Sequence, residues 1–225
     1  MNNPIVVALD VPSAAEALRL VRQLGDAVQW YKVGMELFAA EGPAFVRQLA
    51  AAGHFVFLDM KYYDIPETVK RATAVVASLG AKLLTVHAVD QVMRAAVDGR
   101  QGSDLKLLGV TVLTSFDDSD LRMEGYSATV AELVAARVAR ARAAGVDGIV
   151  CSPVEVARVR EIAGPDAILV TPGVRSAGAD KGDQKRVATP RQALASGASL
   201  LVIGRQITRA ADPRAEALRI RAEIE

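Results

Sequence analysis

Short apolar runs alternate with amphipathic stretches along this chain of 225 residues. Each run is long enough for a strand that is buried on both faces. The runs cover residues 5–9, 30–33, 55–58, 83–87, 107–113, 148–151, 168–171 and 200–203. Between them, apolar residues recur at the spacing of one helix face. The clearest of these stretches are residues 14–24, 43–52, 68–79, 130–144 and 153–162.

A glycine stands shortly before many of the predicted strands, where it can adopt the left-handed conformation that ends a helix. These glycines are Gly53, Gly80, Gly145, Gly164 and Gly197. Eight strand–helix repeats of this kind predict an α/β fold, a (β/α)8 TIM barrel. The alternative is a doubly wound open sheet, but no run carries the charges or proline typical of an edge strand. No linker interrupts the pattern, so we expect residues 1–225 to form a single domain.

Composition excludes several classes of function. Charges nearly cancel, with 27 basic and 26 acidic residues, which gives no support for binding to nucleic acid or an anionic membrane. The one cysteine, Cys151, excludes an internal disulfide and suits a reducing compartment. No apolar run approaches the length of a membrane span, and no basic segment followed by a long apolar stretch opens the chain. We therefore expect a cytoplasmic protein.

Three charges follow the third apolar run within six residues: Asp59, Lys61 and Asp64. On a strand, Asp59 and Lys61 would share one face because they are two positions apart. Pro66 suits the first turn of a helix, so the charges lie where a strand gives way to a helix. A structural ion pair at the strand end is the alternative interpretation. The third charge favours a functional cluster.

Polar and charged residues also follow the other predicted strands, at the face of the barrel that carries catalytic groups. They include Asp10, Lys32, His87, Thr114, Ser152, Pro172, Arg175, Gly204 and Arg205. Lys32 lies inside an apolar run, and a buried ammonium needs a partner. We expect it to join Asp59, Lys61 and Asp64 in a network of alternating charge. The alternative is that Lys32 extends outward to solvent.

Glycine and arginine occur together after the last two predicted strands, as Gly173 with Arg175 and as Gly204 with Arg205. Glycine lets backbone amides approach phosphate oxygens, and arginine binds them in a bidentate way. These loops are the usual phosphate site of such barrels. A tight turn beside a surface arginine is the alternative for each pair. The long loop 173–190 is expected to be a lid over the site, or otherwise a disordered surface loop.

Other chemistries lack their usual signals. His54 and His87 belong to no cluster with metal-ligand spacing, Cys151 has no paired base, and no GxGxxG follows a strand. The residues alone therefore predict a barrel that acts on a phosphorylated small molecule without metal or cofactor. Its reactive centre would be a network of lysine and aspartate, and Schiff-base chemistry by a lysine remains open.

The motif Asp-x-Lys-x-x-Asp-Ile-Pro-x-Thr, from Asp59 to Thr68, resembles the signature of the orotidine 5′-monophosphate decarboxylase family, in its bacterial form. The resemblance covers essentially the whole chain. Its further segments are residues 8–10, 31–34, 110–115, 171–175, 182–186 and 202–205. Two small departures lie between the charged positions. The family has Phe-His where this chain has Tyr62-Tyr63, and Asn where it has Glu67.

The resemblance implies decarboxylation of orotidine 5′-monophosphate to UMP, the last step of de novo pyrimidine nucleotide biosynthesis, without metal or cofactor. Lys61 would stabilise the C6 carbanion and donate the proton, within a catalytic group completed by Lys32, Asp59 and Asp64. Asp64, Ile65 and Thr68 would reach the neighbouring subunit's site, which implies a homodimer with shared sites. The other implied substrate contacts are Asp10 to the ribose, Thr114 to the pyrimidine, and Pro172, Arg175, Gln184, Gly204 and Arg205 at the phosphate.

Two rival functions remain. Metal-dependent phosphosugar decarboxylases and aldolases share a similar barrel and the Asp-x-Lys-x-x-Asp motif. They carry a carboxylate where this chain has Lys32, so Lys32 and Thr114 favour the orotidine interpretation. The second rival is a nucleotide-binding barrel that has lost catalysis. It is disfavoured because every expected charged position is filled.

Overall fold

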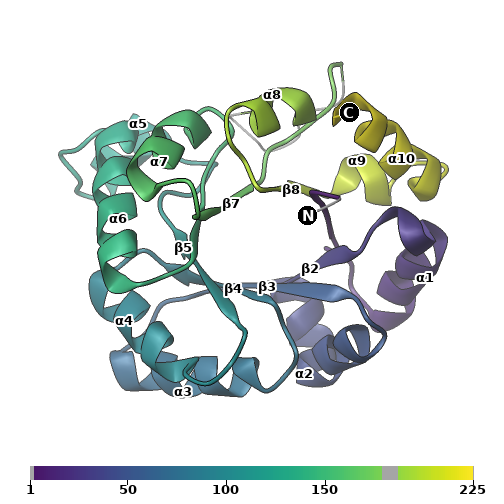
Figure 1. Cartoon of the computed structure of the whole chain (residues 1–225), viewed down its shortest axis with the longest axis horizontal. Helices are drawn as coiled ribbons and strands as arrows, with labels where there is room; N and C mark the ends of the chain where they lie inside the picture. Colours follow the sequence, from purple (N-terminus) through teal and green to yellow (C-terminus); the bar gives the residue numbers. More distant parts are fainter. Residues whose placement is uncertain (1–2, 179–186, 225) are drawn as a thin grey trace.

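The computed structural model describes residues 3–178 and 187–224, and within them eight parallel strands form a closed barrel. Each strand pairs with the next one in the chain, and β8 pairs with β1 (Figure 1). The strands are β1 (Ile5–Ala8), β2 (Trp30–Gly34), β3 (Phe55–Tyr62), β4 (Leu83–His87), β5 (Lys106–Val110), β6 (Gly148–Val150), β7 (Ile168–Thr171) and β8 (Leu200–Ile203). The predicted (β/α)8 barrel is thus confirmed.

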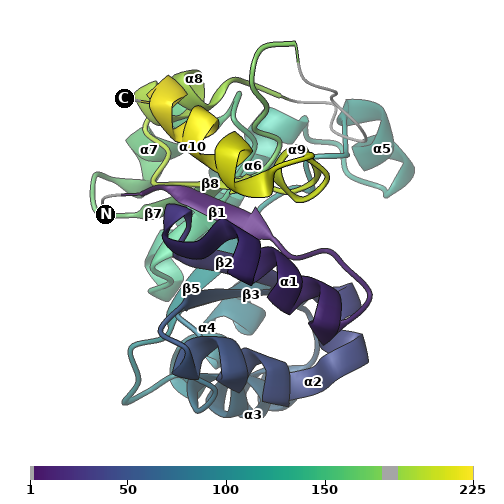
Figure 2. The ribbon, with the colours of Figure 1, turned by 90° about the vertical axis from the view of Figure 1, so that its right-hand side faces the viewer.

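Helices surround the barrel on all sides (Figures 1 and 2). They are α1 (Ala14–Leu24), α2 (Met35–Ala51), α3 (Pro66–Ala77), α4 (Asp90–Gly99), α5 (Asp118–Met123), α6 (Val130–Ala144), α7 (Val156–Ala163), α8 (Pro190–Ala195), α9 (Arg205–Thr208) and α10 (Pro213–Ile224), with one 3-10 turn at Gly25–Ala27. Capping boxes fix where α6 and α8 begin, because Thr129 and Thr189 each accept from a backbone N–H three residues on.

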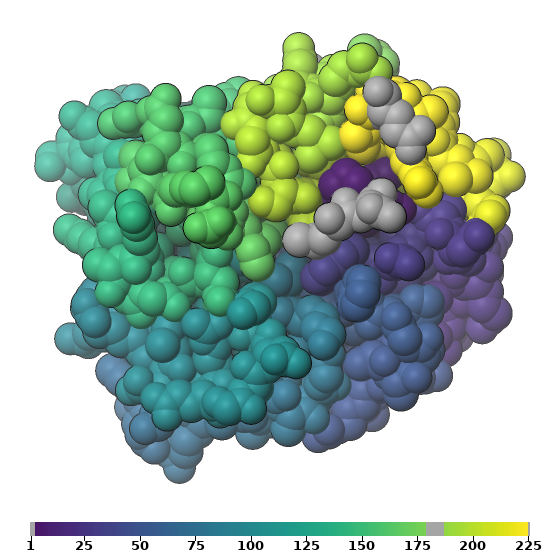
Figure 3. Space-filling view, viewed as in Figure 1, coloured from purple at the N-terminus to yellow at the C-terminus, as the bar shows by residue number. Residues whose placement is uncertain are grey.

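The first and last helices close the ring against each other. Arg214 on α10 donates to the carbonyl of Leu24 at 2.9 Å and forms an ion pair with Asp26 at 2.6 Å. Figure 3 shows the same closure on the surface, where the yellow end of the chain lies beside the purple beginning. This closure seals the apolar layer between strands and helices near both ends of the chain.

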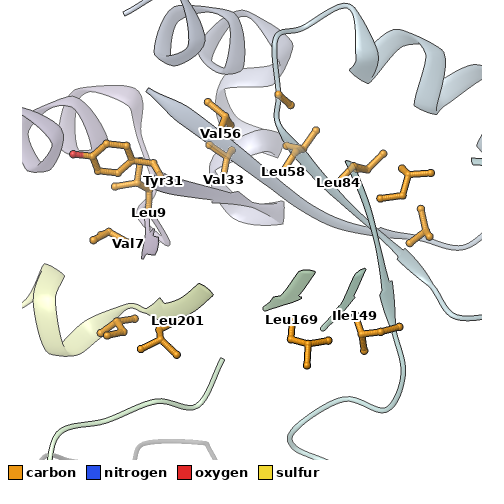
Figure 4. Packing of buried hydrophobic residues seen from close by; sticks show 14 of the residues in the cluster. Val7, Leu9, Tyr31, Val33, Val56, Leu58, Leu84, Ile149, Leu169 and Leu201 are labelled. Atoms are coloured by element: carbon orange, nitrogen blue, oxygen red, sulfur yellow. The ribbon is translucent and has the colours of Figure 1, made fainter. Parts of the chain in front are cut away.

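Two apolar clusters make the core. The larger lies between strands and helices, and Figure 4 shows members such as Leu58, Leu169 and Leu201 on the outer sides of their strands. The smaller fills the barrel interior with alternate strand residues. Its buried members are Val6, Ala8, Trp30, Phe57, Leu83, Leu108, Val170, Leu200 and Val202. Burying a side chain of the size of Leu83 contributes about 1.5–3 kcal/mol.

The predicted elements differ from the observed ones in several places; for example, the fifth run, residues 107–113, is a strand only as far as Val110. Strand β3 continues four residues beyond the predicted end at Leu58. Helix α2 begins earlier than predicted and is kinked at Gly42, whose φ of 64° breaks the helical conformation just before Pro43. The segment between β5 and α6, for which no helix was predicted, contains the short helix α5. Within the described ranges, no helix is long and apolar enough to cross a membrane.

Candidate functional site

The charged site is the next layer above the apolar barrel interior. Lys32, Asp59 and Thr85 each lie two positions beyond an interior residue of the smaller cluster, namely Trp30, Phe57 and Leu83. Because side chains alternate along a strand, all three face the inside of the barrel at its carboxyl end. The strands therefore deliver an ammonium, a carboxylate and a hydroxyl to one place.

A bulge in β3 changes the direction of the chain at this level. Leu58 pairs with Leu84 on β4, but the next pairing joins Tyr62 to Val86. Three residues of β3, from Asp59 to Lys61, therefore stand opposite the single residue Thr85. Lys61 has φ of 49°, the one positive value of a non-glycine residue in the described ranges. That conformation is costly for lysine and occurs mainly where the surrounding structure enforces it.

Asp59 lies between two lysine ammonium groups. Its Oδ1 accepts from Lys61 Nζ at 2.9 Å, and its Oδ2 lies 3.6 Å from Lys32 Nζ. Burial alone raises the pKa of Asp59. The charges of Lys32 and Lys61 and the hydrogen bonds from Lys61 and Thr85 outweigh burial, so the pKa of this carboxyl lies below its usual value. Asp59 is therefore a carboxylate at neutral pH.

Lys32 also forms an ion pair that the sequence did not predict. Its Nζ lies 2.8 Å from Oδ1 of Asp10, directly after β1. The Lys32 side chain is 9% exposed and that of Asp59 is 15% exposed, whereas Lys61 is 26% and Asp10 57% exposed. In this row of alternating charges, Asp10 and Lys61 are thus accessible to a ligand, whereas Lys32 and Asp59 between them are largely buried.

Asp64 lies outside this network in the described structure. Its Oδ1 accepts from the backbone N–H of Ile65 at 2.6 Å. The carboxylate is exposed, and no ion pair to another residue of the described ranges accompanies this hydrogen bond. The predicted network of four charges is therefore assembled here as Lys32, Asp59 and Lys61, with Asp10 added and Asp64 apart.

His87 at the end of β4 borders the same face. Its ring lies 5.4 Å from that of Tyr63, centroid to centroid. Burial lowers the pKa of His87, and the charges of Arg137 and Lys61 lower it further. The imidazole is therefore neutral at physiological pH and adds no positive charge beside Lys61.

The two predicted phosphate arginines open into one cleft. Arg175 after β7 and Arg205 after β8 line a space of about 540 Å³, together with Gly204, Asp10 and Lys32. Guanidinium groups bind phosphate oxygens in a bidentate way. The two arginines and part of the charge network, Asp10 and Lys32, therefore line the same cleft.

The loop that carries Arg175 is tied at its base. Val174 and Ala188 form an isolated parallel bridge, and the N–H of Arg175 donates to the carbonyl of Ala188 at 3.0 Å. Pro172 and Thr114 occupy the turns after β7 and β5, and both are half-buried. Gln184, which the resemblance assigns to the phosphate, lies outside the described residues.

An apolar edge adjoins the charged motif. Tyr63 and Ile65 are 68% and 67% exposed, which is high for large apolar side chains. They line a hollow of about 420 Å³ together with Asp64, Pro66 and Val92. Thr68, on the first turn of α3, is exposed at the same edge.

Two polar residues near the site, Thr85 and Gln206, were not predicted from the sequence. Thr85 bonds both Asp59 and Lys61, and Gln206 bonds Ser176 between the turns that follow β8 and β7. A threonine within an apolar run reads as a packing residue, so no signal pointed to it. Ser176 and Gln206 each directly follow a predicted arginine, and that adjacency was the available signal.

The described residues contain no group of three or more histidine, cysteine, aspartate or glutamate side chains that could hold a metal ion. The chemistry of Asp59 agrees with this, because both of its carboxylate oxygens already face ammonium groups. A divalent cation at the same position would be repelled by Lys32 and Lys61.

Residues 3–220 match the family model described as "Orotidine 5'-phosphate decarboxylase / HUMPS family". A relative from Bradyrhizobium sp. (strain ORS 278), named orotidine 5'-phosphate decarboxylase, is 54% identical over 220 residues, covering 98% of this chain and 90% of its own. A relative of the same name from Methylobacterium sp. (strain 4-46) is 56% identical over 223 residues, covering 98% and 94%.

A comparison with solved structures points to the same family. The crystal structure of orotidine 5'-phosphate decarboxylase from Lactobacillus acidophilus is similar to this one with a TM-score of 0.88 and 37% sequence identity, over 99% of each chain. Fold and sequence thus agree over nearly the full length. The chain belongs to the orotidine 5'-phosphate decarboxylase / HUMPS family.

Proposed function

We propose that Lys61, held by Asp59, carries out the decarboxylation of orotidine 5′-monophosphate. The reaction itself follows from the family and from relatives of about the same length: the chain is a carboxy-lyase of pyrimidine biosynthesis that converts this nucleotide to UMP. The observation that carries the residue assignment is Lys61, whose partly exposed ammonium lies 2.9 Å from Asp59 Oδ1.

Loss of CO2 leaves a carbanion at C6, in the plane of the ring and outside its π system. No electron sink is available, so a positive charge that is already in place must stabilise it. Lys61 supplies that charge and then delivers its proton to C6, which yields UMP. Asp59 and the left-handed backbone of Lys61 fix the ammonium, so little reorganisation is needed during the reaction.

Repulsion between Asp59 and the substrate carboxylate contributes less. Two like charges about 4 Å apart repel by roughly 4 kcal/mol at an effective dielectric constant of 20. Relief of that repulsion in the transition state gives about a thousandfold. Typical enzymatic accelerations need about 8 kcal/mol or more. The cation of Lys61 therefore carries more of the effect than the repulsion.

The phosphate is the proposed source of remote binding energy. Arg175, Arg205 and Gly204 would hold it, with Gln184 from the loop and Pro172 at the turn, while Asp10 would contact the ribose and Thr114 the pyrimidine. The shared cleft of Arg175, Arg205, Asp10 and Lys32 supports this assignment. Binding energy at the phosphate helps to fix the ring against Lys61 and to exclude water.

We further propose that two chains share their sites. Asp64, Ile65 and Thr68 would reach the site of the partner subunit, where Asp64 would extend the charge network beyond Lys61. The exposed apolar side chains of Tyr63 and Ile65 support an interface here. Support also comes from Asp64, whose carboxylate stays outside the network of its own subunit.

The rival in the same barrel group uses a metal-stabilised enediolate. Lys32 takes the place where that rival carries a carboxylate, and both oxygens of Asp59 face ammonium groups. These contacts support a reaction in which no metal is bound at Asp59. Two further proposals concern the whole chain. Residues 1–225 form one domain, which one cooperative melting transition would support. The protein resides in the cytoplasm, which cell fractionation tests.

Isotope incorporation tests the role of Lys61. In D2O, turnover of orotidine 5′-monophosphate should give UMP with one deuterium at C6, because the ammonium protons of Lys61 exchange with solvent. Turnover by Lys61→Ala at a rate near that of the unchanged enzyme would show that another group stabilises the carbanion. The matched control is Lys82→Ala, which removes an exposed lysine between α3 and β4.

A further inference from the structure

Thr85 is a fully buried residue of β4 whose hydroxyl both accepts and donates a hydrogen bond. Its Oγ1 accepts from the backbone N–H of Lys61 at 2.9 Å and donates to Oδ1 of Asp59 at 3.0 Å. The same Oδ1 accepts from Lys61 Nζ at 2.9 Å. Lys61 is therefore held at its backbone and at its ammonium, and Thr85 joins the two points into one closed ring of hydrogen bonds.

The bulge explains why a side chain is needed at this point. Between the pairings of Leu58 with Leu84 and Tyr62 with Val86, the backbone ladder is interrupted. There the N–H of Lys61 donates a hydrogen bond to the hydroxyl of Thr85 instead of to a strand carbonyl. A buried N–H without an acceptor is costly. The hydroxyl thus stabilises the bulge where the backbone of Lys61 takes its left-handed conformation.

We propose that Thr85 is a positioning residue for decarboxylation, whose hydroxyl sets the left-handed backbone of Lys61 and aims the Lys61 ammonium at C6. Thr85 is 0% exposed, so it acts through Lys61 and Asp59 and does not touch the substrate. The inference rests on the proposed role of Lys61. It adds a residue of β4, from the middle of an apolar run, to the charged residues of the motif.

The test compares variants that keep or lose the hydroxyl. Thr85→Val and Thr85→Ala lose it with different packing, and Thr85→Ser keeps it. The matched control is Thr73→Val on α3, because Thr73 is equally buried and its hydroxyl has no hydrogen-bond partner in the described structure. Each variant is checked for folding by thermal melting and for site integrity by its affinity for UMP.

The expected result separates kcat from binding. Loss of the hydroxyl should lower kcat by about 10- to 100-fold, since one buried N–H and one carboxylate lose a partner. The KM for orotidine 5′-monophosphate and the affinity for UMP should change by less than about threefold, because the phosphate and ribose contacts remain. Thr85→Ser and Thr73→Val should stay within about threefold of the unchanged enzyme in kcat.

The pH profile gives a second readout that a packing role would not move. The hydrogen bond from Thr85 is one of the contacts that lower the pKa of Asp59. Losing the hydroxyl therefore raises that pKa, and the acid limb of kcat should move to higher pH in Thr85→Val and Thr85→Ala. Thr85→Ser should keep the limb of the unchanged enzyme.

Three outcomes would overturn the inference. They are near-normal kcat in folded Thr85→Val, a loss in Thr85→Ser as large as in Thr85→Val, and failure of both hydroxyl-free variants to fold while Thr85→Ser folds. The last would assign the hydroxyl to stability alone. Failure of the proposed function is distinct, because Lys61→Ala would then turn over normally or the unchanged protein would not turn over at all.

Discussion

The side-chain amide of Gln206 bonds Ser176 twice, donating from Nε2 to Ser176 Oγ at 2.8 Å and accepting the Ser176 N–H at 3.2 Å. Each of these residues directly follows a proposed phosphate arginine. The pair also rests on α10, because Gln206 donates to Glu216 at 2.9 Å and Ser176 donates to Glu223 at 2.8 Å. The two turns that carry Arg175 and Arg205 are thus fixed to each other.

Gln206→Leu should weaken phosphate binding without changing contacts to the base. Gln206→Leu removes three hydrogen bonds, each worth roughly 1 kcal/mol, and the part of this loss that affects the two arginines leaves them less well placed. The affinity for UMP should fall about 5- to 30-fold by calorimetry. The affinity for uridine should stay unchanged. Gln23→Leu on the exposed face of α1 is the control. An equal loss for uridine and UMP would contradict the role of Gln206.

Arg205→Ala should act on phosphorylated ligands alone. A charge-assisted hydrogen bond contributes about 1.5–3 kcal/mol, so the affinity for UMP should fall about 10- to 150-fold. Uridine binding should be preserved, because uridine has no phosphate for Arg205 to bind. Arg140→Ala, an exposed arginine of α6, should leave both affinities as they are. Equal losses of affinity for uridine and UMP would show that Arg205 does not bind the phosphate.

Mixed subunits test the proposal that two chains share their sites. Lys61→Ala and Asp64→Ala should each be nearly inactive alone. When the two are mixed and allowed to exchange, one site of the mixed dimer has neither change. A statistical mixture contains half mixed dimers, so about a quarter of the sites should regain activity. Absence of recovery, with subunit exchange proven by labelled chains, would place Asp64 in the site of its own subunit or outside catalysis.

The acid range reports on Asp59. Its pKa in the folded protein lies below the usual value, because the lysine charges and hydrogen bonds outweigh burial. Its stabilising contribution is therefore complete above the unfolded pKa of about 3.9 and is lost progressively as the pH falls from there through the lower folded value. Lys32→Met removes one of the charges that lower this pKa. The raising effect of burial is then opposed less, so the pKa of Asp59 in the folded protein should rise.

Denaturation at a series of pH values measures this effect. In Lys32→Met, stability should fall less than in the unchanged protein as the pH drops below about 3.9, because the pKa of Asp59 in the folded protein then lies closer to its unfolded value. Lys82→Met, which changes an exposed lysine, should follow the unchanged protein. Parallel curves for Lys32→Met and the unchanged protein would show that Lys32 does not hold the charge of Asp59.

Much of the fold was predictable because the apolar pattern is local. The runs at residues 83–87, 168–171 and 200–203 coincide with β4, β7 and β8, since each strand is buried on both faces. The contact between Lys32 and Asp59 was predictable for a related reason. A lysine in an apolar strand needs a counter-charge, and the motif on the neighbouring strand offered one.

What remained hidden depends on register, which periodicity does not reveal. The alternation rule placed Asp59 and Lys61 on one face of a regular strand, but they meet through a bulge. Thr85 opposite that bulge has the residue type of an ordinary β-branched packing residue. The pairing of Asp10 with Lys32 likewise follows from the alignment of Ala8 with Lys32 between two strands. These relations are tertiary, so one sequence alone does not reveal them.

The most direct measurement follows the ultraviolet change as chelator-treated protein is mixed with orotidine 5′-monophosphate, with Lys61→Ala beside it. We expect fast conversion to UMP by the unchanged enzyme. Lys61→Ala should lose about 4 kcal/mol or more of transition-state stabilisation, which lowers kcat at least about a thousandfold, while UMP binding is retained. Conversion that needs added metal, or a Lys61→Ala enzyme with near-normal kcat, would contradict these expectations.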